Sequence, residues 1–274
     1  MTAAPRPATA ARADHTTAAA PAPPAGPPIL AAARAFGVTF GPSAVLLGAE
    51  AAGLAATAGA LARGRRPTLP ALAGVAIAAA HRLVARPWMA GWGASGADLR
   101  RPLPGDELVP DPASESTRAV TIDAPPEAVW PWIAQLGQDR GGFYSYRWLE
   151  NLAGCRMPDA HEIHPEWQGR VVGETVLLHP LKGLPVAAFE PRHALVLEGW
   201  GAFVVQPAPG PGGGTRLLAR GRVPHGLGAW IGALLVDVPH FVMERRMLLG
   251  IKARAEAAAR SPAAFRVDGA GPAG

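Results

Sequence analysis

The chain is 274 residues long, enough for one sizeable hydrophobic core and further segments. Hydrophobic residues make up 49% of it, but many are alanines, which bury little apolar surface. The net charge is +5 and the arginines are scattered along the chain, so the sequence predicts no nucleic-acid partner. Cys155 is the only cysteine, which excludes an internal disulfide and agrees with a reducing compartment.

Both ends of the chain predict disordered tails. Residues 1–28 are rich in Ala, Pro and Thr and contain almost no large apolar residues. Such a segment cannot bury enough surface to offset its chain entropy. It also differs from a secretory signal, because its apolar stretch comes late. Residues 261–274 form a second tail, rich in Pro and Gly.

Residues 29–90 predict a hydrophobic helical hairpin. Ser43 to Ala62 contains Glu50 as its single charged residue, and Leu69 to Ala80 contains none. Helix N-caps are expected at Ser43, which opens the first segment, and at Thr68, which comes just before the second. Arginines occupy the turn between the two segments.

The hairpin is predicted to attach the protein to a membrane. Its first helix has about the ~20 residues needed to span a bilayer. The second has a shorter uncharged run, and would need Arg82 and Arg86 to snorkel. A soluble hairpin packed on the domain is the alternative. If only the first helix spans, the arginine excess after it places the C-terminal domain in the cytoplasm. Glu50 is either functional inside the bilayer or placed at a helix interface.

Residues 91–115 predict a linker with turns. Gly91, Gly93 and Gly96 match the G-x-G-x-x-G pattern of dinucleotide-binding loops. No clear strand precedes them, and Arg101-Pro102 stops any helix that follows. We therefore expect no nucleotide and no other cofactor here.

A folded domain is expected over residues 116–260. Ser116 to Ile122 is rich in β-branched residues and predicts a strand. Asp123 is the expected N-cap of a following helix, which Pro131 makes short or kinked. One face of that helix is apolar, with Val129, Trp132, Ile133 and Leu136. Tyr144 to Leu152 predicts a second short helix.

A run of strands and one long helix complete the domain. Alternating apolar residues predict strands at Val172–His179, Leu184–Phe189, His193–Gly199, Trp200–Gln206 and Thr215–Val223. Gly210 to Gly214 reads as a hairpin loop, and the last strand is expected to be wet on its arginine-bearing face. A final helix is best defined from Pro239 to Arg260, with Pro239 in its first turn.

This order predicts an α+β domain in which a curved antiparallel sheet wraps on the terminal helix. A sheet with one apolar face must bury that face, and the terminal helix is the long element left to cover it. A cavity can remain between sheet and helix, closed at one end by the two short helices.

Six short segments carry a resemblance to a known family: Ala124–Trp130, Gln135–Gly137, Gly141–Tyr146, Leu149–Gly154, Ile163–Gln168 and Phe241–Met247. They resemble the helix-grip superfamily of START, pollen-allergen-like and polyketide cyclase/dehydrase proteins (SRPBCC), over about Trp88 to Ala259. The branch is one of actinobacterial type, in which a hydrophobic N-terminal segment can precede the domain. Acids are common there at two positions: Glu174 keeps one, and Arg147 departs from the other.

The resemblance implies a pocket for a hydrophobic small molecule, such as a lipid or a polyketide-like ring system. Aromatic walls with a few polar groups are typical of such pockets. The candidate ligand-binding residues are Trp132, Phe143, Tyr144, Tyr146, Trp148, Glu150, His164, Trp167, Trp200, Phe203, Met243 and Met247. Each also fits ordinary core packing, and the two tyrosines are favoured because a hydroxyl can orient a ligand.

Metal binding and catalysis have weaker signals. His161 and His164 lie near Asp159, Glu162 and Cys155, but no standard zinc spacing appears, and no metal is expected. Two functions remain open. One is the binding or carriage of a hydrophobic molecule at a membrane. The other is a cyclase, aromatase or dehydratase, for which acid–base candidates are Glu150, His164, Glu198 and Arg245.

Overall fold

The computed structural model describes residues 28–209 and 213–260. The two predicted tails, except Pro28 itself, and the middle of the predicted 210–214 loop lie outside these ranges. The described part is an α+β structure with a six-stranded antiparallel sheet and a long C-terminal helix. The predicted fold class is confirmed at this level.

The sheet has the strand order β1-β6-β5-β4-β3-β2. Consecutive strands from β2 to β6 are neighbours, and β1 returns to pair with β6 at the opposite edge from β2. Each predicted strand is present, and the last has the predicted bounds. The strands are β1 (Ser114–Ile122), β2 (Thr175–His179), β3 (Lys182–Glu190), β4 (Ala194–Leu197), β5 (Gly201–Pro207) and β6 (Thr215–Val223).

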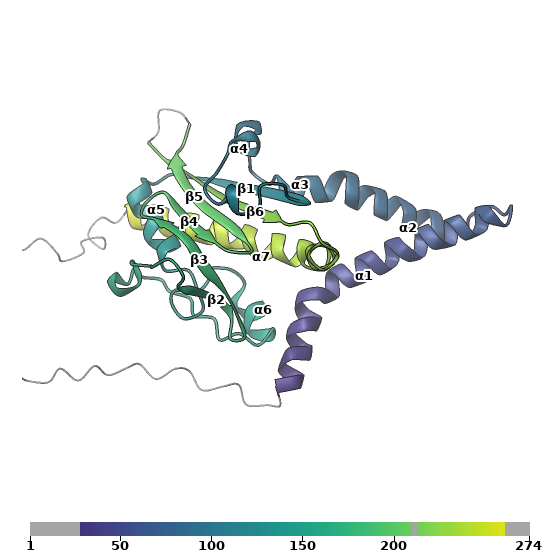
Figure 1. Ribbon diagram of the computed structural model, residues 1–274, viewed down its shortest axis with the longest axis horizontal. Coiled ribbons are helices and arrows are strands. Elements are labelled where there is room, and N and C mark those ends of the chain that lie inside the picture. Colours follow the sequence, from purple (N-terminus) through teal and green to yellow (C-terminus); the bar gives the residue numbers. More distant parts are fainter. Residues whose placement is uncertain (1–27, 210–212, 261–274) are drawn as a thin grey trace, which may run out of the picture.

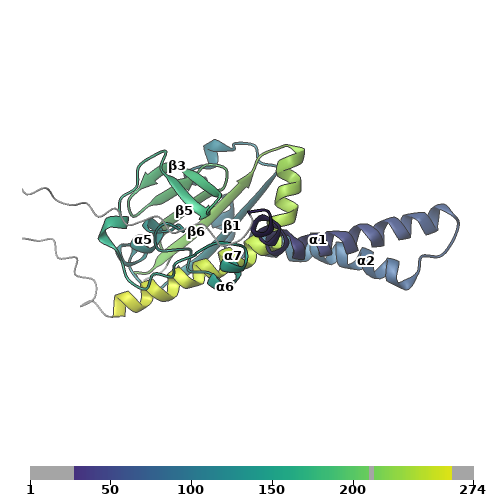
Figure 2. The same ribbon diagram turned by 90° about the horizontal axis from the view of Figure 1, so that it is seen from below.

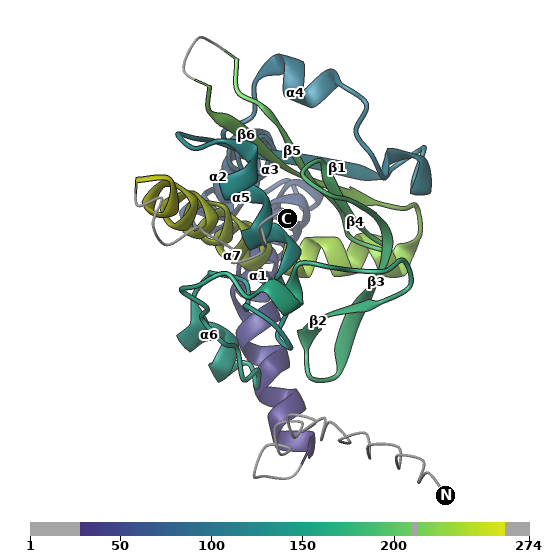
Figure 3. The same ribbon diagram turned by 90° about the vertical axis from the view of Figure 1, so that its left-hand side faces the viewer.

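Helices α7 (Leu227–Arg260) and α5 (Pro126–Ala134) cover one face of the sheet. The core between them includes Phe203 and Leu217 from the sheet and Leu248 and Ile251 from α7, all fully buried. The predicted placement of the terminal helix on the sheet is therefore confirmed. Figure 3 shows α7 and α5 on this side of the sheet, and α4 (Gly96–Arg100) on the other.

The expected linker folds over the second face of the sheet. It contains α4 and the short 3-10 helix Asp106–Leu108. Its Leu103 is buried against Val196 and Leu218 of the outer face. The backbone of Gly93 packs closely on β1: a Cβ at this position would lie 2.1 Å from the carbonyl oxygen of Ala119. This close approach is a structural reason for a glycine here.

The prediction of a wet outer face on β6 was wrong. Its arginines are held by acids of the covering segment and of β1: Arg216–Asp98 at 2.7 Å, Arg220–Asp106 at 3.1 Å and Arg222–Glu115 at 2.7 Å. Arg220 is only 5% exposed. The alternating arginines therefore form a row of ion pairs and not a solvated face. Their partners lie about a hundred residues away in the sequence, so the local pattern did not reveal them.

Helices α1 (Pro28–Ala62) and α2 (Leu69–Ala80) lie side by side and project away from the sheet (Figures 1 and 2). Glycines allow the closest approach, since a Cβ on Gly53 would lie 2.5 Å from the Gly74 Cα. The π-helical turn η1 (His81–Ala85) and α3 (Arg86–Ala90) continue α2. Because α1 already begins at Pro28, the predicted N-cap at its serine was wrong.

Two helices of the described ranges are long and apolar enough to cross a membrane. They are Ser43–Ala62 and the continuous helix Leu69–Ala90, which we call together the stem. Only 11% and 22% of their most apolar windows are buried. Exposed apolar side chains such as Val45, Leu61 and Leu83 account for this.

Three helix boundaries in the domain differ from prediction. The N-cap of α5 is Pro125 rather than Asp123, because Pro126 supplies the preorganised first turn. The second short helix, α6, begins later, at Arg147, since Tyr144 has a non-helical backbone. Helix α7 begins at Leu227, so Pro239 is inside it and not in its first turn. Figure 2 shows that α7 runs in two directions, as expected for a helix with an internal proline.

The domain and the stem meet at a buried ion pair. Arg118 of β1 binds Glu244 of α7, and both side chains are at most 5% exposed. The same arginine donates from Nε to the carbonyl oxygen of Met89 in α3, at 2.8 Å. Nearby, Arg86 of α3 pairs with Asp237 of α7 at 2.9 Å. The end of the stem is thus tied to both β1 and α7.

Replacing Glu244 by alanine should lower the free energy of unfolding by about 3 to 5 kcal/mol, because the Arg118 charge is left buried with no carboxylate beside it. The exposed Glu190→Ala variant, whose pair with His193 is half-exposed, is the control and should change stability by less than about 0.5 kcal/mol. Chemical denaturation of the full-length protein in detergent, followed by tryptophan fluorescence, measures both. An equal effect of the two variants would contradict the role of the pair.

Candidate functional site

The candidate site is centred on Tyr144, in the loop between α5 and α6. Its φ is 53°, in the left-handed region that a bulky residue rarely adopts. The side chain is only 3% exposed and packs directly on α7. Gly250 permits this contact, since a Cβ there would lie 2.3 Å from the Tyr144 carbonyl oxygen. Backbone strain of this kind is kept only where the surroundings impose it.

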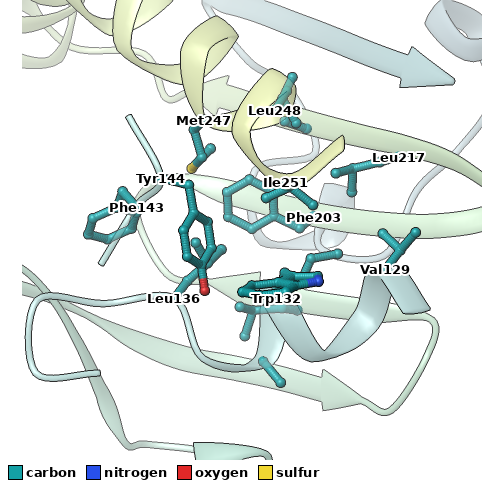
Figure 4. Packing of buried hydrophobic residues seen from close by; sticks show 14 of the residues in the cluster. Val129, Trp132, Leu136, Phe143, Tyr144, Phe203, Leu217, Met247, Leu248 and Ile251 are labelled. Atoms are coloured by element: carbon teal, nitrogen blue, oxygen red, sulfur yellow. The ribbon is translucent and has the colours of Figure 1, made fainter. Parts of the chain in front are cut away.

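Two side chains hold the Tyr144 ring. The indole of Trp132 from α5 meets it edge to face, with 5.7 Å between ring centroids. The guanidinium of Arg254 from α7 lies over it, 4.7 Å from the centroid. Arg254 is itself held by the carboxylate of Asp159 and by the carbonyl oxygen of Ala160. Figure 4 shows the ring between α7 and α5, close to Met247 and Trp132.

Two buried polar atoms of this cluster have no hydrogen-bond partner among the described residues. They are the Tyr144 hydroxyl and the Trp132 Nε1. The nearby side-chain amide of Gln135 donates one N–H to the carbonyl oxygen of Glu162 and accepts from the amide of His164. Burial raises the pKa of Tyr144 above its usual range, so the hydroxyl keeps its proton, although the second N–H of Gln135 lies close enough to the hydroxyl to lower this pKa in part. In Figure 4 the two atoms point in different directions, the hydroxyl toward Leu136 and the indole nitrogen toward Val129.

A third unpartnered atom belongs to Glu150 of α6. Its Oε2 is buried and has no partner in the described ranges. Burial, and then the charge of Asp159, raise the pKa of Glu150 to about 7. Burial, and then Glu150, raise the pKa of the Cys155 thiol to about 11. Near neutral pH this region therefore offers a carboxyl group that can give or take a proton, and a thiol that stays protonated and is a poor nucleophile.

The structure brings five of the predicted ligand-binding residues together in one core. They are Trp132, Phe143, Tyr144, Phe203 and Met247, and all are at least nine-tenths buried. Met243 is half-buried beside them, and its carbonyl oxygen accepts from the Ser145 hydroxyl at 2.8 Å. In this structure these side chains pack against one another and fill the space between the sheet and α7 (Figure 4).

Other predicted ligand-binding residues lie toward the surface. Trp148 of α6 is 68% exposed. Tyr146 lies half-buried under the guanidinium of Arg246, 5.7 Å from the ring centroid. His164 and Trp167 stack on each other at 4.0 Å on the loop after α6. Trp200 stands at the edge of the core and donates from Nε1 to His240 at 2.9 Å.

The remaining acid–base and metal candidates are not gathered. Glu198 is exposed, and Arg245 lies over the ring of Trp92 on the surface of α7. His161 is 76% exposed, 3.7 Å from Asp159. Within residues 28–209 and 213–260, no group of three or more His, Cys, Asp or Glu side chains is placed to hold a metal ion. Glu150 is the acid–base candidate that lies in the cluster.

The two positions at which the resemblance implies acids have separate surroundings. Glu174 accepts from Arg140 and Arg170, each at 2.7 Å. Because Arg170 also donates to carbonyl oxygens of Ala134 and Leu136, this carboxylate fixes the end of α5. Arg147 is exposed at the start of α6.

Sequence reasoning missed Gly250 and Arg254 as parts of the site. A glycine inside a long helix costs about 1 kcal/mol relative to alanine, and so indicates close packing. That signal was present in the sequence, but it does not name the partner. The pairing of Arg254 with Asp159 joins residues far apart in the chain and has no local signature.

A hollow of ≈ 290 Å³, open solvent included, lies on the other side of the sheet. It is bounded by the covering segment near Asp106 and by the β4–β5 turn at Trp200. Drug-sized ligands usually occupy enclosed pockets of about 300 to 1,000 Å³. This hollow is therefore a poor candidate for the site of an apolar ligand.

Comparison with models of known protein families finds no match to this chain. Comparison with curated protein sequences finds none either.

The raised pKa of Glu150 predicts a pH-dependent stability. The folded protein holds this proton more tightly than the unfolded chain between pH 4.5, the usual pKa, and pH 7. Stability relative to Glu150→Gln should therefore fall by about 2 kcal/mol as the pH rises through this window, a value reduced for partial exposure. Thermal unfolding of both full-length proteins over a pH series measures it. A stability difference that does not change with pH would show that Glu150 is not desolvated.

Proposed function

We propose that the protein binds or carries a hydrophobic small molecule, such as a lipid or a polyketide-like compound, in a helix-grip domain of the SRPBCC type. The ligand lies between the sheet, α7 and the segment from α5 to α6. Helices α1 and α2 form a hairpin that holds the protein in a membrane, with both ends of the hairpin on the side of the C-terminal domain.

The Tyr144 hydroxyl is the observation that carries this proposal. A buried hydroxyl without a partner costs about 1 to 3 kcal/mol, and folded proteins keep few of them. This one lies beside Gly141 and the amide of Gln135 and belongs to a residue with a strained backbone. A ligand with one polar oxygen and an apolar body supplies the missing hydrogen-bond partner. Its apolar body replaces contacts between core side chains with similar contacts to the ligand.

The segment that carries Tyr144 is followed by a short helix that packs little against the domain. Helix α6, which follows it, has no buried residue. Its Trp148 and Leu152 are exposed. Moving this segment outward opens the core beside Trp132 and Met247 without breaking a strand pair. We infer that the ligand enters by this route, since the interior is otherwise filled.

Membrane attachment is supported by the stem. Both of its helices have the length and composition of a membrane span, and they expose most of their surface. Trp88, Arg82 and Arg86 stand where the second helix approaches the domain, and Trp88 is 58% exposed. Tryptophan and arginine are typical of the boundary between hydrocarbon and headgroups.

A second function, a cyclase, aromatase or dehydratase, is favoured by one observation. A carboxyl group with a pKa near 7 is suited to proton transfer at neutral pH, and Glu150 has this property. Its unpartnered Oε2 is free to meet a substrate oxygen. Catalysis usually requires several converging groups, and His164 and Glu198 do not join Glu150, so carriage is the better supported function.

Tyr144→Phe should weaken binding of an apolar ligand about tenfold, because it removes one hydrogen bond. Stability of the ligand-free protein should stay the same or rise slightly, since the hydroxyl has no partner there. The matched control is Tyr146→Phe, which should change affinity less than about twofold. The ligand is first identified by native mass spectrometry of full-length protein purified from its own host. The affinity of each variant for it is then measured by titration.

Two outcomes would contradict the proposal. If the purified protein carries no lipid or ring compound and also binds no apolar fluorophore, the proposed carriage is wrong. If Tyr144→Phe binds as tightly as the parent, the ligand lies elsewhere in the molecule.

The predicted topology can be tested with single cysteines in a Cys155→Ala chain. Thr68→Cys lies in the exposed turn between α1 and α2, and Glu190→Cys lies in the exposed β3–β4 turn. A hairpin that spans twice places these two positions on opposite sides, so a membrane-impermeant maleimide should label one of them in intact spheroplasts and the other only after permeabilisation. Labelling of Glu190→Cys without permeabilisation would place the domain outside the cytoplasm, labelling of Thr68→Cys would place it inside, and recovery of the full-length protein in the soluble fraction would exclude attachment.

A further inference from the structure

A second group of buried polar side chains lies inside the stem. Glu50 of α1 is 1% exposed. One of its carboxylate oxygens lies 2.5 Å from Nδ1 of His81, and the other accepts from Nε of Arg82 at 3.2 Å. His81 opens the π-helical turn η1, an irregularity that often marks functional positions. Ionisable side chains within a membrane span are costly, and are functional candidates for that reason.

The contact with Glu50 determines what the other imidazole nitrogen can do. Because both carboxylate oxygens act as acceptors here, Nδ1 of His81 carries the hydrogen and donates it. In the neutral imidazole the Nε2 atom then carries a lone pair and is an acceptor. It is buried and has no hydrogen-bond partner among the described residues. A carboxylate that orients an imidazole in this way is the arrangement that prepares the opposite nitrogen for a ligand.

The surroundings make this nitrogen unusual. In a bilayer no water is present to pair with it, and an unpaired polar atom in hydrocarbon is unfavourable. Ser43 and Thr57 lie one heptad before and after Glu50, hence on the same side of α1. Their hydroxyl oxygens are also buried and have no partner within the described ranges. The inner side of the stem therefore carries several polar atoms whose partners are missing.

Molecules dissolved in the bilayer can reach the edge of this group. His81 keeps 11% of its side chain exposed. Ala79 and Ala80, which precede His81 in α2, are exposed and small. A slender apolar molecule can lie against them and insert its hydroxyl beside the ring, so that the contact of Nδ1 with Glu50 is kept.

We propose that the stem contains a binding site for a lipid-soluble alcohol or phenol, whose hydroxyl donates a hydrogen bond to Nε2 of His81. The apolar body of the molecule lies along Ala79 and Ala80 of α2, where a hydrocarbon chain of the bilayer would otherwise lie. Glu50 and Arg82 hold the imidazole in the accepting orientation. This inference rests on the proposed membrane position of the stem, and it concerns a site separate from the Tyr144 cluster.

The test compares two probes that differ by one hydroxyl, para-nonylphenol and nonylbenzene. The full-length protein is placed in phospholipid nanodiscs with its histidines labelled by the heavy nitrogen isotope. The phenol should shift the Nε2 resonance of His81, which is assigned by its loss in His81→Phe, and nonylbenzene should leave it in place. The phenol should also bind about tenfold more tightly than nonylbenzene, as expected for one hydrogen bond.

Two histidine variants and the parent protein give separate outcomes. His81→Phe should bind both probes equally, and His161→Phe, at an exposed histidine of the domain, should keep the preference for the phenol. Equal shifts of the Nε2 resonance by the two probes would overturn the proposal. So would an Nε2 resonance of a protonated nitrogen before any probe is added, because that nitrogen has no lone pair to offer. Both outcomes are read on the parent protein, and for them His81→Phe serves only to assign the resonance.

The outcomes also separate this proposal from the function proposed above. Loss of the maleimide pattern at Thr68→Cys would show that the stem does not span, and so would remove the basis of both membrane proposals. A normal maleimide pattern with no response to para-nonylphenol would overturn the stem site alone. Binding at the Tyr144 cluster is reported by Tyr144→Phe and is independent of His81.

Discussion

The buried ion pair between Arg118 and Glu244 is the interaction on which the arrangement of the molecule depends. It lies where the edge strand β1, the helix α7 and the end of the stem meet. Arg118 also lies over the ring of Phe241, 5.4 Å from its centroid. A buried guanidinium is tolerated only with its partners in place. A shift of any one of these elements would therefore leave the Arg118 charge buried and uncompensated, which is strongly destabilising. A single side chain thus relates the sheet, its covering helix and the apolar stem.

Helix α7 is the element that links the stem to the candidate site. Before Pro239 it carries Asp237, which pairs with the stem through Arg86. After Pro239 it carries the residues that hold Tyr144, namely Gly250 and Arg254. The internal proline breaks the regular hydrogen bonding between these two halves. The two halves can therefore follow different directions, one along the base of the stem and the other across the sheet.

The fold was predictable as far as local pattern determines it. Alternation of apolar residues located every strand, and even the bounds of β6, because the period of a strand is a local property. The covering of the outer face was not predictable, since it depends on pairs such as Arg220 with Asp106 that join distant parts of the chain. The start of α7 was missed for a related reason. Pro239 is a strong local signal for a first turn, and tertiary packing overrides it.

The site was predictable in its residue types but not in its geometry. Aromatic density and one family resemblance named Tyr144 and Glu150 among the candidates, and both have unpartnered polar atoms among the described residues. The same reasoning named Trp148, which is exposed, because composition does not distinguish a ring that faces the core from one that faces solvent. The left-handed backbone of Tyr144 depends on Gly250, a hundred residues later, and no local pattern contains it.

The domain interior and the stem pose the same chemical problem. In each, a buried ring has one polar atom that lacks a partner among the residues described: the hydroxyl of Tyr144 and the Nε2 of His81. Filling either place with a purely hydrocarbon molecule would leave the polar atom unpaired, and filling it with a strongly polar one would leave the apolar walls against a hydrated group. A molecule with an apolar body and one hydroxyl satisfies both conditions. Because α7 contacts the stem at one end and the Tyr144 ring at the other, the two places lie along one helix.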